Sequence, residues 1–293
     1  MPLPESRCWV CNNTEMLRVK SSDVTGDLKS QNFSITDYNY GVTDAIDKCQ
    51  TCGFLQCSNI EDVLKYYVDM DDEDYESTRT QRALQAKKLV NRVVRYKACG
   101  DWLDVGAGSG ILVEQAQKRG FNSVGIEPSV ALCDKARVLN LPVVNGVLPH
   151  VEIGHHYDVV TLIDIVEHVT DPYSLILAAR AAMSDDGVCI VVVPDVQSMA
   201  ARVMGWRWWH YRIAHVGYFD QHNMTKLLNR GGLEVVNISR PSWYFPVSYL
   251  LDRVLSYVPV FSRLSAPKAL DNITIPLNLY DSLCFVCKKS HAK

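Results

Sequence analysis

The segment WLDVGAGSGIL, residues 102–112, joins an apolar run to three glycines at alternate positions, Gly106, Gly108 and Gly110. The apolar run predicts a buried strand, and the residues after the glycines predict a helix. A glycine-rich turn between a strand and a helix lets the backbone approach a ligand and directs the helix N-terminus toward it. The segment therefore predicts a nucleotide-binding site.

The spacing of the glycines leaves the kind of nucleotide open. Ile111 occupies the position where a dinucleotide fingerprint would have its third glycine, so the fingerprint of an NAD site is only half met. Glu127 ends the next predicted strand, where a carboxylate can accept hydrogen bonds from both ribose hydroxyls. These features favour a nucleoside with free 2′ and 3′ hydroxyls, which NAD and S-adenosylmethionine both contain.

Strand-like and helix-like segments alternate from Asp101 onward. The predicted strands of this region are WLDVG, SVGIE, VVNG, YDVVTLID and GVCIVVV. Their alternation with helices implies right-handed crossovers and a parallel sheet covered on both faces. The predicted fold class is a doubly wound, Rossmann-like α/β fold, which the later strands LEVVNIS and DSLCFVCKK would complete.

Composition limits the function classes. The chain has 293 residues, 47% of them apolar, which is enough for one large core and a small second one. A net charge of -3 provides no field that would attract nucleic acid or anionic lipid. The first residues lack the charged and apolar parts of a secretory signal, and no apolar run approaches the length of a membrane span. We therefore expect a cytoplasmic protein that does not bind nucleic acid.

Two C-x-x-C pairs stand in the N-terminal part of the chain, Cys8 with Cys11 and Cys49 with Cys52. Four thiolates arranged as two knuckles suit tetrahedral Zn²⁺ and predict a zinc ribbon. A zinc ion with four protein ligands has no open coordination position, so we expect its role to be structural. The alternative is a pair of redox-active or unliganded dithiols.

Three motifs together carry a resemblance to a known family. LDVGAGSG at residues 103–110, VGIEPS at 124–129 and YDVVTLIDIVEHVTDP at 157–172 resemble, in order and spacing, the class I S-adenosylmethionine-dependent methyltransferases. The resemblance extends from Trp102 to the C-terminus. It implies a seven-stranded sheet that ends in an antiparallel strand pair, with S-adenosyl-L-methionine as the cofactor.

The same resemblance implies roles for residues around that cofactor. By this resemblance, the methionine part of the cofactor is lined or closed over by Asp104, Gly106, Gly108, Gly110, Asp164 and Ile165, and Asp104 helps to hold its amino group. Likewise by resemblance, Glu127 binds the ribose, Val147 or Leu148 flanks the adenine, and Tyr75 covers the cofactor.

Candidate catalytic residues lie where the strand ends meet insertions, since ligands of such sheets bind there. Glu167 and His168 follow the fourth predicted strand, and His215 lies in an aromatic insertion. In similar methyltransferases that act on sugars and other small molecules, the corresponding stretches border the acceptor pocket. The resemblance therefore implies that His168 or His215 removes the acceptor proton. Alternatively, His168 orients its loop and His215 is a buried hydrogen-bonding residue.

The aromatic side chains of the insertion GWRWWHYRIAHVGYF, residues 205–219, allow three interpretations. They could form a lid or stacking wall for a sugar or aromatic ring, pack as the core of the insertion, or face a membrane surface in a weak contact.

The predicted organisation is a zinc ribbon over residues 1–58, a helical linker covering the cofactor site over 59–99, and a methyltransferase domain over 100–293. This domain has acceptor-side insertions at 195–220 and 242–275. The layout is similar to that of bacterial methyltransferases of deoxysugar, surface polysaccharide or secondary-metabolite synthesis. The expected function is methyl transfer to a hydroxyl, or alternatively to a carbon or nitrogen, of a sugar or sugar nucleotide.

Two other functions fit the same motifs. An RNA methyltransferase could grip its substrate through the ribbon, although residues 1–60 carry more acidic than basic side chains. A non-catalytic protein could bind the cofactor and use the ribbon as an interaction module.

Overall fold

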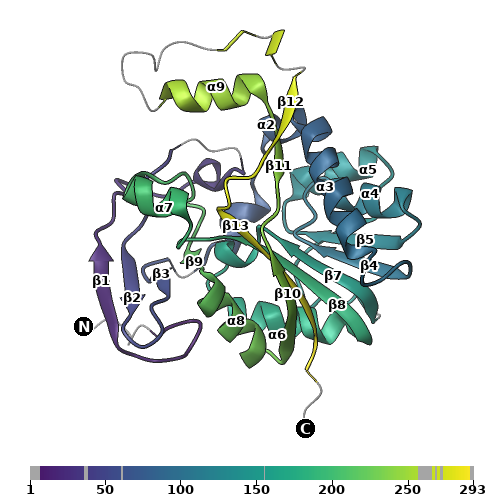
Figure 1. Ribbon diagram of the computed structural model, residues 1–293, viewed down its shortest axis with the longest axis horizontal. Coiled ribbons are helices and arrows are strands. Elements are labelled where there is room, and N and C mark those ends of the chain that lie inside the picture. Colours follow the sequence, from purple (N-terminus) through teal and green to yellow (C-terminus); the bar gives the residue numbers. More distant parts are fainter. Residues whose placement is uncertain are drawn as a thin grey trace.

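A seven-stranded sheet lies at the centre of the protein, in a computed structural model that describes residues 7–35, 39–60, 62–154, 156–256, 266–267, 269–270 and 273–290 (Figure 1). Its strands are ordered β10-β13-β8-β7-β4-β5-β6. In chain order, they are β4 (Asp101–Val105), β5 (Asn122–Glu127), β6 (Val143–Asn145), β7 (Tyr157–Ile163), β8 (Met183–Pro194), β10 (Leu233–Ser239) and β13 (Ser282–Lys289).

Strands β4, β5, β6, β7 and β8 pair parallel with one another, and the connections after β4, β5 and β7 each contain a helix that crosses back over the sheet. Strand β13 pairs antiparallel with both β8 and β10. The predicted doubly wound fold, its seven strands and the final antiparallel pair are therefore confirmed.

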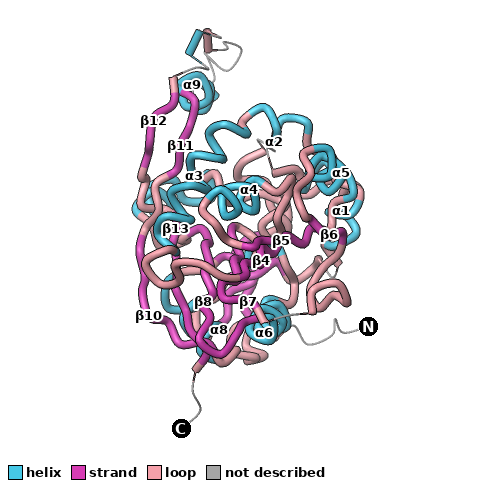
Figure 2. The backbone as a smooth tube through the Cα atoms, turned by 90° about the vertical axis from the view of Figure 1, so that its right-hand side faces the viewer, coloured by secondary structure: helices cyan, strands magenta, loops and turns pink. Residues whose placement is uncertain are grey.

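Helices cover both faces of this sheet (Figure 2). They are α3 (Arg79–Val93), α4 (Ile111–Lys118), α5 (Val130–Val138), α6 (Pro172–Ala182) and α8 (Gln221–Arg230). Residues of α3 and α4 share one buried core with one face of β7, β8 and β13, and residues of α6 and α8 share another core with the opposite face. Helix α3 buries Ala86, Val90 and Val93, which lie three or four residues apart, so this apolar stripe faces the sheet.

The N-terminal strands form a second, four-stranded sheet of β1 (Met16–Lys20), β2 (Ile46–Cys49), β3 (Leu55–Cys57) and β9 (Gly217–Tyr218). Strand β9 comes from the aromatic insertion and pairs antiparallel with β3. The ring of Phe54 also lies 4.7 Å from that of Phe219, between centroids. The N-terminal region therefore shares its sheet and its core with the insertion instead of folding around a core of its own.

Short helical segments connect these two sheets. They are η1 (Ser30–Phe33), α1 (Leu64–Val68), α2 (Glu73–Ser77), η2 (Val166–His168), α7 (Met199–Met204) and η3 (Gly205–Arg207). Segments α1 and α2 belong to the predicted linker. Segment η2 follows β7, and α7 with η3 opens the aromatic insertion.

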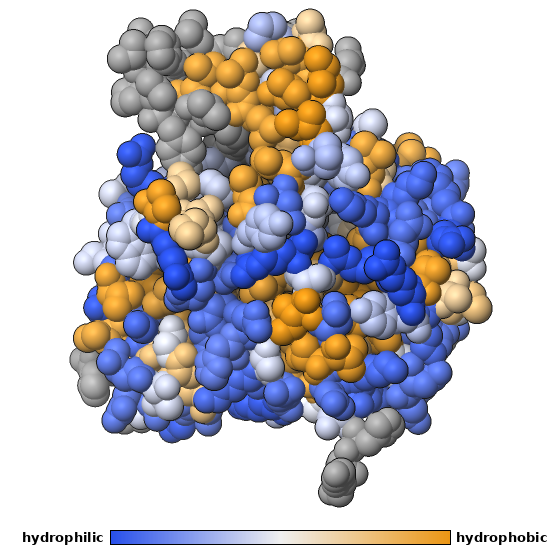
Figure 3. Space-filling view, in the orientation of Figure 1, coloured by the Kyte–Doolittle hydropathy of each residue, from blue (hydrophilic) through white to orange (hydrophobic). Residues whose placement is uncertain are grey.

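An arm projects beyond the sheets and consists of β11 (Trp243–Pro246), helix α9 (Val247–Ser256) and β12 (Thr274–Leu277). Figure 1 shows it at the top of the molecule, and Figure 3 shows apolar side chains gathered over it. It corresponds to the predicted insertion at 242–275, of which residues 257–265, 268, 271 and 272 lie outside the described part. Within the described part of the chain, no helix has the length and apolar character needed to cross a membrane.

The contact between Phe54 and Phe219 should bind the small sheet to the large one. Both side chains are fully buried, so Phe54→Ala and Phe219→Ala should each lower the free energy of unfolding by about 3–5 kcal/mol. Their double variant should reveal a coupling of about 0.5–1.5 kcal/mol in denaturant titrations. Leu17→Ala, at a side chain that is 54% exposed, is the matched control and should change stability by less than about 0.5 kcal/mol. Strictly additive effects would contradict the predicted link.

Candidate active site

A cavity of 1490 Å³ lies at the carboxyl ends of β4, β5 and β7. Except for Gly110, every residue predicted from the sequence to bind the cofactor or to act in catalysis lines it. These lining residues are Tyr75, Asp104, Gly106, Gly108, Glu127, Leu148, Asp164, Ile165, Glu167, His168 and His215. Drug-sized ligands occupy pockets of about 300–1,000 Å³, so this cavity has room for two ligands side by side.

The side chains of Ile165 and Tyr75 pack closely against the glycine loop. Gly106 and Gly108 have φ values of +72° and +54°, which residues other than glycine rarely adopt. A Cβ on Gly106 would lie 2.1 Å from Cδ1 of Ile165, and one on Gly108 would lie 2.8 Å from the Tyr75 hydroxyl. Gly110, which is not among the lining residues, has φ +79° and is the N-cap of α4.

The Glu127 carboxylate is held by backbone donors. The Gly108 N–H donates to Oε2 over 2.8 Å and the Ser129 N–H donates to Oε1 over 2.9 Å. Burial raises the pKa of Glu127, while these two hydrogen bonds act in the opposite direction. Each oxygen keeps a second lone pair, so the group can still accept hydrogen bonds from a ligand diol in the cavity.

Asp104 and Asp164 place two further carboxyl groups in the cavity. Burial raises the pKa of each to about 7. Asp104 accepts a hydrogen bond of 2.7 Å from the Thr161 hydroxyl. Asp164 has φ +54°, a conformation that aspartate tolerates better than most residues. Two carboxyls that ionise near neutral pH are suited to receiving a cationic group.

The linker closes the site over the glycine loop. The Arg82 guanidinium lies 4.2 Å from the centre of the Tyr75 ring, in cation–π contact. Arg79 donates to the Ser109 hydroxyl over 3.0 Å. The Ser129 hydroxyl donates to the carbonyl of Met70 over 2.7 Å. These contacts fix the linker on both sides of the loop, although the sequence pointed only to Tyr75.

Glu167, His168 and His215 meet at the other end of the cavity. The ring centroids of the two histidines are 4.7 Å apart, at an angle of 88°. Burial is the first cause that lowers the pKa of His168 to about 3 and the pKa of His215 well below its usual value. Burial also raises the pKa of Glu167 well above its usual value. Both imidazoles are therefore neutral near pH 7 and carry a free lone pair.

Tyr67 and Arg212 also contribute to this end, and sequence reasoning missed both. The Tyr67 hydroxyl lies 2.6 Å from Nδ1 of His168. Arg212 is buried and donates to the carbonyl oxygens of Ser34 and Ile35. Tyr67 lies far from the recognised motifs in the sequence, so no local pattern could have indicated its contact. Arg212 could have been suspected from its place between His210 and His215.

The aromatic insertion is mostly core. Four of its aromatic residues are at most 6% exposed and pack with the N-terminal sheet: Trp208, Tyr211, Tyr218 and Phe219. Trp209 lines the cavity, and its indole N–H donates to Asp281 over 3.0 Å. Core packing therefore holds for these four residues, and at Trp209 the wall for a ligand stays a prediction.

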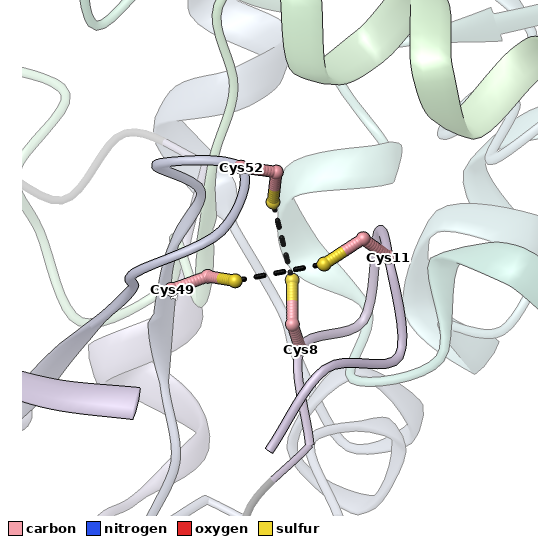
Figure 4. A group of neighbouring side chains, drawn as sticks. All are labelled: Cys8, Cys11, Cys49 and Cys52. Carbon is pink, nitrogen blue, oxygen red and sulfur yellow. Dashed lines mark hydrogen bonds between the residues drawn. The ribbon is translucent and has the colours of Figure 1, made fainter. Parts of the chain in front are cut away.

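The four cysteines of the two C-x-x-C pairs come together away from the cavity (Figure 4). Sγ of Cys8 lies 3.5 Å from Sγ of Cys52, and Sγ of Cys11 lies 3.5 Å from Sγ of Cys49. Four sulfurs bound to one Zn²⁺ at about 2.3 Å would lie about 3.8 Å apart, so this donor set fits the metal with a small expansion.

Curated relatives share part of the chain. Ubiquinone biosynthesis O-methyltransferases from Actinobacillus pleuropneumoniae and Hydrogenovibrio crunogenus are 35% and 38% identical, each over 29% of this chain. The matches span 42% and 39% of those proteins, so the chain spans about two fifths of their length. The enzyme of the same name from Cereibacter sphaeroides is 28% identical over 53% of this chain and 69% of its own.

Solved structures share the fold. An S-adenosylmethionine-dependent methyltransferase from Clostridium acetobutylicum has a TM-score of 0.51 and 12% identity, covering 74% of this chain and 98% of its own. Magnesium protoporphyrin IX methyltransferase from Synechocystis, solved with bound S-adenosylhomocysteine, has a TM-score of 0.50 and 15% identity, covering 75% of this chain and 89% of its own.

A family model described as a methyltransferase domain matches residues 78–238, which is more than half of the chain. The matched region contains the glycine loop, Glu127 and the strand that leads to Glu167 and His168. The chain therefore belongs to this methyltransferase family.

Proposed function

We propose that the protein transfers the methyl group of S-adenosylmethionine to a hydroxyl of a small ring-shaped acceptor, a class that includes sugars and sugar nucleotides. The observation that carries the proposal is the cavity itself. It joins the glycine loop and Glu127 at one end to Glu167, His168 and His215 at the other. The curated relatives are O-methyltransferases by name, which supports oxygen as the acceptor atom.

The cavity residues fit the cofactor in the roles that the resemblance implies. Bound S-adenosylmethionine supplies a methyl group activated by its sulfonium charge. The free lone pairs of Glu127 would accept the ribose hydroxyls, and Asp104 with Asp164 would receive the ammonium group. Tyr75 and Ile165 cover the loop closely and would exclude water from this end.

The aromatic lining of the cavity supports a ring-shaped acceptor. Aromatic side chains from the insertion and the arm line the cavity: Trp209, Trp243, Tyr244, Phe245 and Tyr249. Flat side chains of this kind stack on sugar or aromatic rings. Trp209 lies near the histidines, because its ring is 6.2 Å from that of His210, which stacks on His215. The neutral imidazoles of His168 and His215 provide basic atoms for the hydroxyl proton.

We also propose that Cys8, Cys11, Cys49 and Cys52 hold a structural Zn²⁺. Their sulfur distances and the four-thiolate donor set support this assignment. Four protein ligands would fill the coordination sphere, so the ion would hold the two knuckles together and leave no position for a substrate.

An acceptor screen with radiolabelled S-adenosylmethionine tests the proposed function. We expect label in a hydroxyl compound of the sugar, sugar-nucleotide or phenol classes, and His168→Gln should lower that turnover by about 10²–10⁴-fold, the usual contribution of a positioned acid or base. Binding of S-adenosylhomocysteine should persist in this variant, because His168 lies at the acceptor end. Label found only in RNA would contradict the proposal.

Replacing Glu127 by alanine should weaken S-adenosylhomocysteine binding at least about tenfold. The variant loses a charged acceptor for the ribose and leaves the Gly108 and Ser129 amides without theirs, and hydrogen bonds to charged groups contribute about 1.5–3 kcal/mol. Isothermal titration calorimetry measures the effect. Glu114→Ala removes a glutamate that lies on α4 and pairs with Arg79 and Lys118, and it should keep the wild-type affinity.

Binding of S-adenosylhomocysteine should weaken as the pH falls from 8 to 6. Asp104 and Asp164 have pKa values of about 7, and only their ionised forms attract an ammonium group. At pH 6 each is about one tenth ionised, so each should raise the apparent Kd about tenfold. Calorimetry in buffers of different ionisation enthalpy should detect proton release on binding near pH 7. Asp164→Asn should flatten the pH profile, and an equally steep profile in that variant would contradict the assignment.

Loss of the zinc ligands should unfold the N-terminal sheet. Cys49→Ser should abolish stoichiometric zinc in elemental analysis and lower the melting temperature, because few apolar side chains there can replace the metal. Cys99 is an exposed cysteine outside the cluster, and Cys99→Ser should keep both the zinc and the stability. A zinc-free wild-type protein with unchanged melting would refute the structural role.

A further inference from the structure

We propose that Glu167, His168 and His215 bind a divalent cation at the acceptor end of the cavity, with coordination positions left for oxygen atoms of the acceptor. The cation site stands on its own geometry. It rests on the proposed function only in the clause that names the acceptor as the source of those oxygens.

The three side chains have the spacing of a metal site. Each offers one ligand atom, and these atoms all lie within 4.8 Å of one another. Bonds of about 2.1 Å to a tetrahedral ion place ligand atoms about 3.4 Å apart, so small side-chain rotations would close the site. Two imidazoles and one carboxylate on one side of an ion, with open positions on the other, suit Fe²⁺, Mn²⁺, Co²⁺ and Zn²⁺.

The Glu167 carboxylate needs a partner that the chain does not supply. Its side chain is only 1% exposed, and neither oxygen has a hydrogen-bond partner among the described residues. A buried carboxylate without a donor is costly, and native structures rarely leave one unsatisfied. The two backbone amides that satisfy Glu127 in the same cavity show how this fold supports a buried carboxylate elsewhere. A cation between Glu167 and the histidines would satisfy it.

The imidazole of His168 is oriented as that of a metal ligand. Its Nδ1 lies 2.8 Å from the carbonyl oxygen of Ala214 and 2.6 Å from the Tyr67 hydroxyl. A carbonyl oxygen can only accept, which favours the tautomer with the proton on Nδ1, and Nε2 then keeps its lone pair. Metal-binding histidines usually donate their other ring N–H to a carbonyl or carboxylate in this way. The ring of His215 has a matching partner in the backbone of His210.

The backbone fixes the two halves of the cluster relative to each other. Glu167 and His168 lie on η2, and His215 lies two residues before β9. The Val216 N–H donates to the carbonyl oxygen of Glu167 over 2.8 Å, and the His215 N–H donates to that of Arg212 over 3.1 Å. The ligands are therefore presented by tied segments and not by independent loops, as a preformed site requires.

The charges around the cluster are compatible with a cation. The positive charge of Arg212 opposes the binding of a cation, because it acts on all three side chains. Its guanidinium is turned toward the carbonyl oxygens of Ser34 and Ile35. Asp164 adds a second carboxyl group that interacts with Glu167. A bound cation would favour the ionised forms of Glu167 and Asp164, and these two carboxylates would together outweigh the charge of Arg212.

An ion at this place would select acceptors by their oxygens. All three ligands line the cavity. The remaining coordination positions of the ion would therefore open into the cavity, where the acceptor is proposed to bind. Two neighbouring oxygens of the acceptor, as in a vicinal diol or catechol, could occupy two positions and orient one hydroxyl. With both imidazole lone pairs on the ion, the ion would replace a histidine as the means of deprotonation: it would lower the pKa of that hydroxyl, whose proton would leave to solvent. This role differs from that of the four cysteines, whose donor set leaves no position for a substrate.

Manganese titration of the zinc-loaded protein tests the site. After removal of weakly bound metal with citrate, elemental analysis gives the zinc content and Mn²⁺ is followed by electron paramagnetic resonance. We expect one Mn²⁺ per chain in addition to one zinc, with spin-echo modulation from imidazole nitrogens in the wild type. A second zinc that resists citrate and is lost in Glu167→Gln would support the site equally.

Variants and controls separate this site from surface binding. Glu167→Gln and His215→Gln should each weaken Mn²⁺ binding at least about tenfold. His210→Gln is the matched control, because this ring stacks on His215 at 5.4 Å but is not one of the three ligands, and it should change the affinity less than twofold. Absence of a second metal, of nitrogen modulation, or of any difference among the variants would overturn the proposal. Retained S-adenosylhomocysteine binding would then show that the cofactor site is intact and that only the cation site has failed.

Discussion

The hydrogen bonds from the Gly108 and Ser129 amides to the Glu127 carboxylate hold the cofactor half of the site together. They join the loop after β4 to the turn after β5, two segments that each need an acceptor at the sheet edge. Glycine is required at Gly108 because its φ is positive and the Tyr75 hydroxyl lies where a Cβ would stand. One carboxylate thereby satisfies buried amides, shapes the loop and leaves lone pairs for a ligand.

The acceptor half is built differently, from segments that are distant in the sequence. Its histidines come from η2 and from the segment just before β9, and Tyr67 of the linker contacts His168. The neutral state of both imidazoles follows from burial, and that burial depends on the aromatic insertion packing against the N-terminal sheet. The chemistry at this end therefore depends on tertiary packing more than on any one motif.

This contrast explains how much could be predicted from the sequence. The strand and helix order, the buried stripe of α3 and the residues of the glycine loop follow from local periodicity and from glycine's freedom at positive φ. The opposite orientation of Cys284 and Cys287 on β13 follows from strand alternation, and the two side chains lie in different cores. Gly110 lies outside the cavity because it caps α4, which glycine spacing alone does not reveal. Tyr67 and Arg212 make their contacts over more than 100 residues of sequence, and no local pattern encodes the partners of such contacts.

The two halves of the molecule meet at Val216. Its carbonyl accepts a hydrogen bond from the Cys57 N–H of β3, and its own N–H donates to the carbonyl of Glu167, each over 2.8 Å. One residue, Val216, thus connects the sheet that carries the cysteine knuckles to the segment that carries the Glu167 carboxylate. A displacement of the N-terminal sheet would move Val216, and with it the neighbouring His215, relative to Glu167. For this reason, the N-terminal sheet acts as a structural support of the acceptor site, although its own cysteines lie away from the cavity.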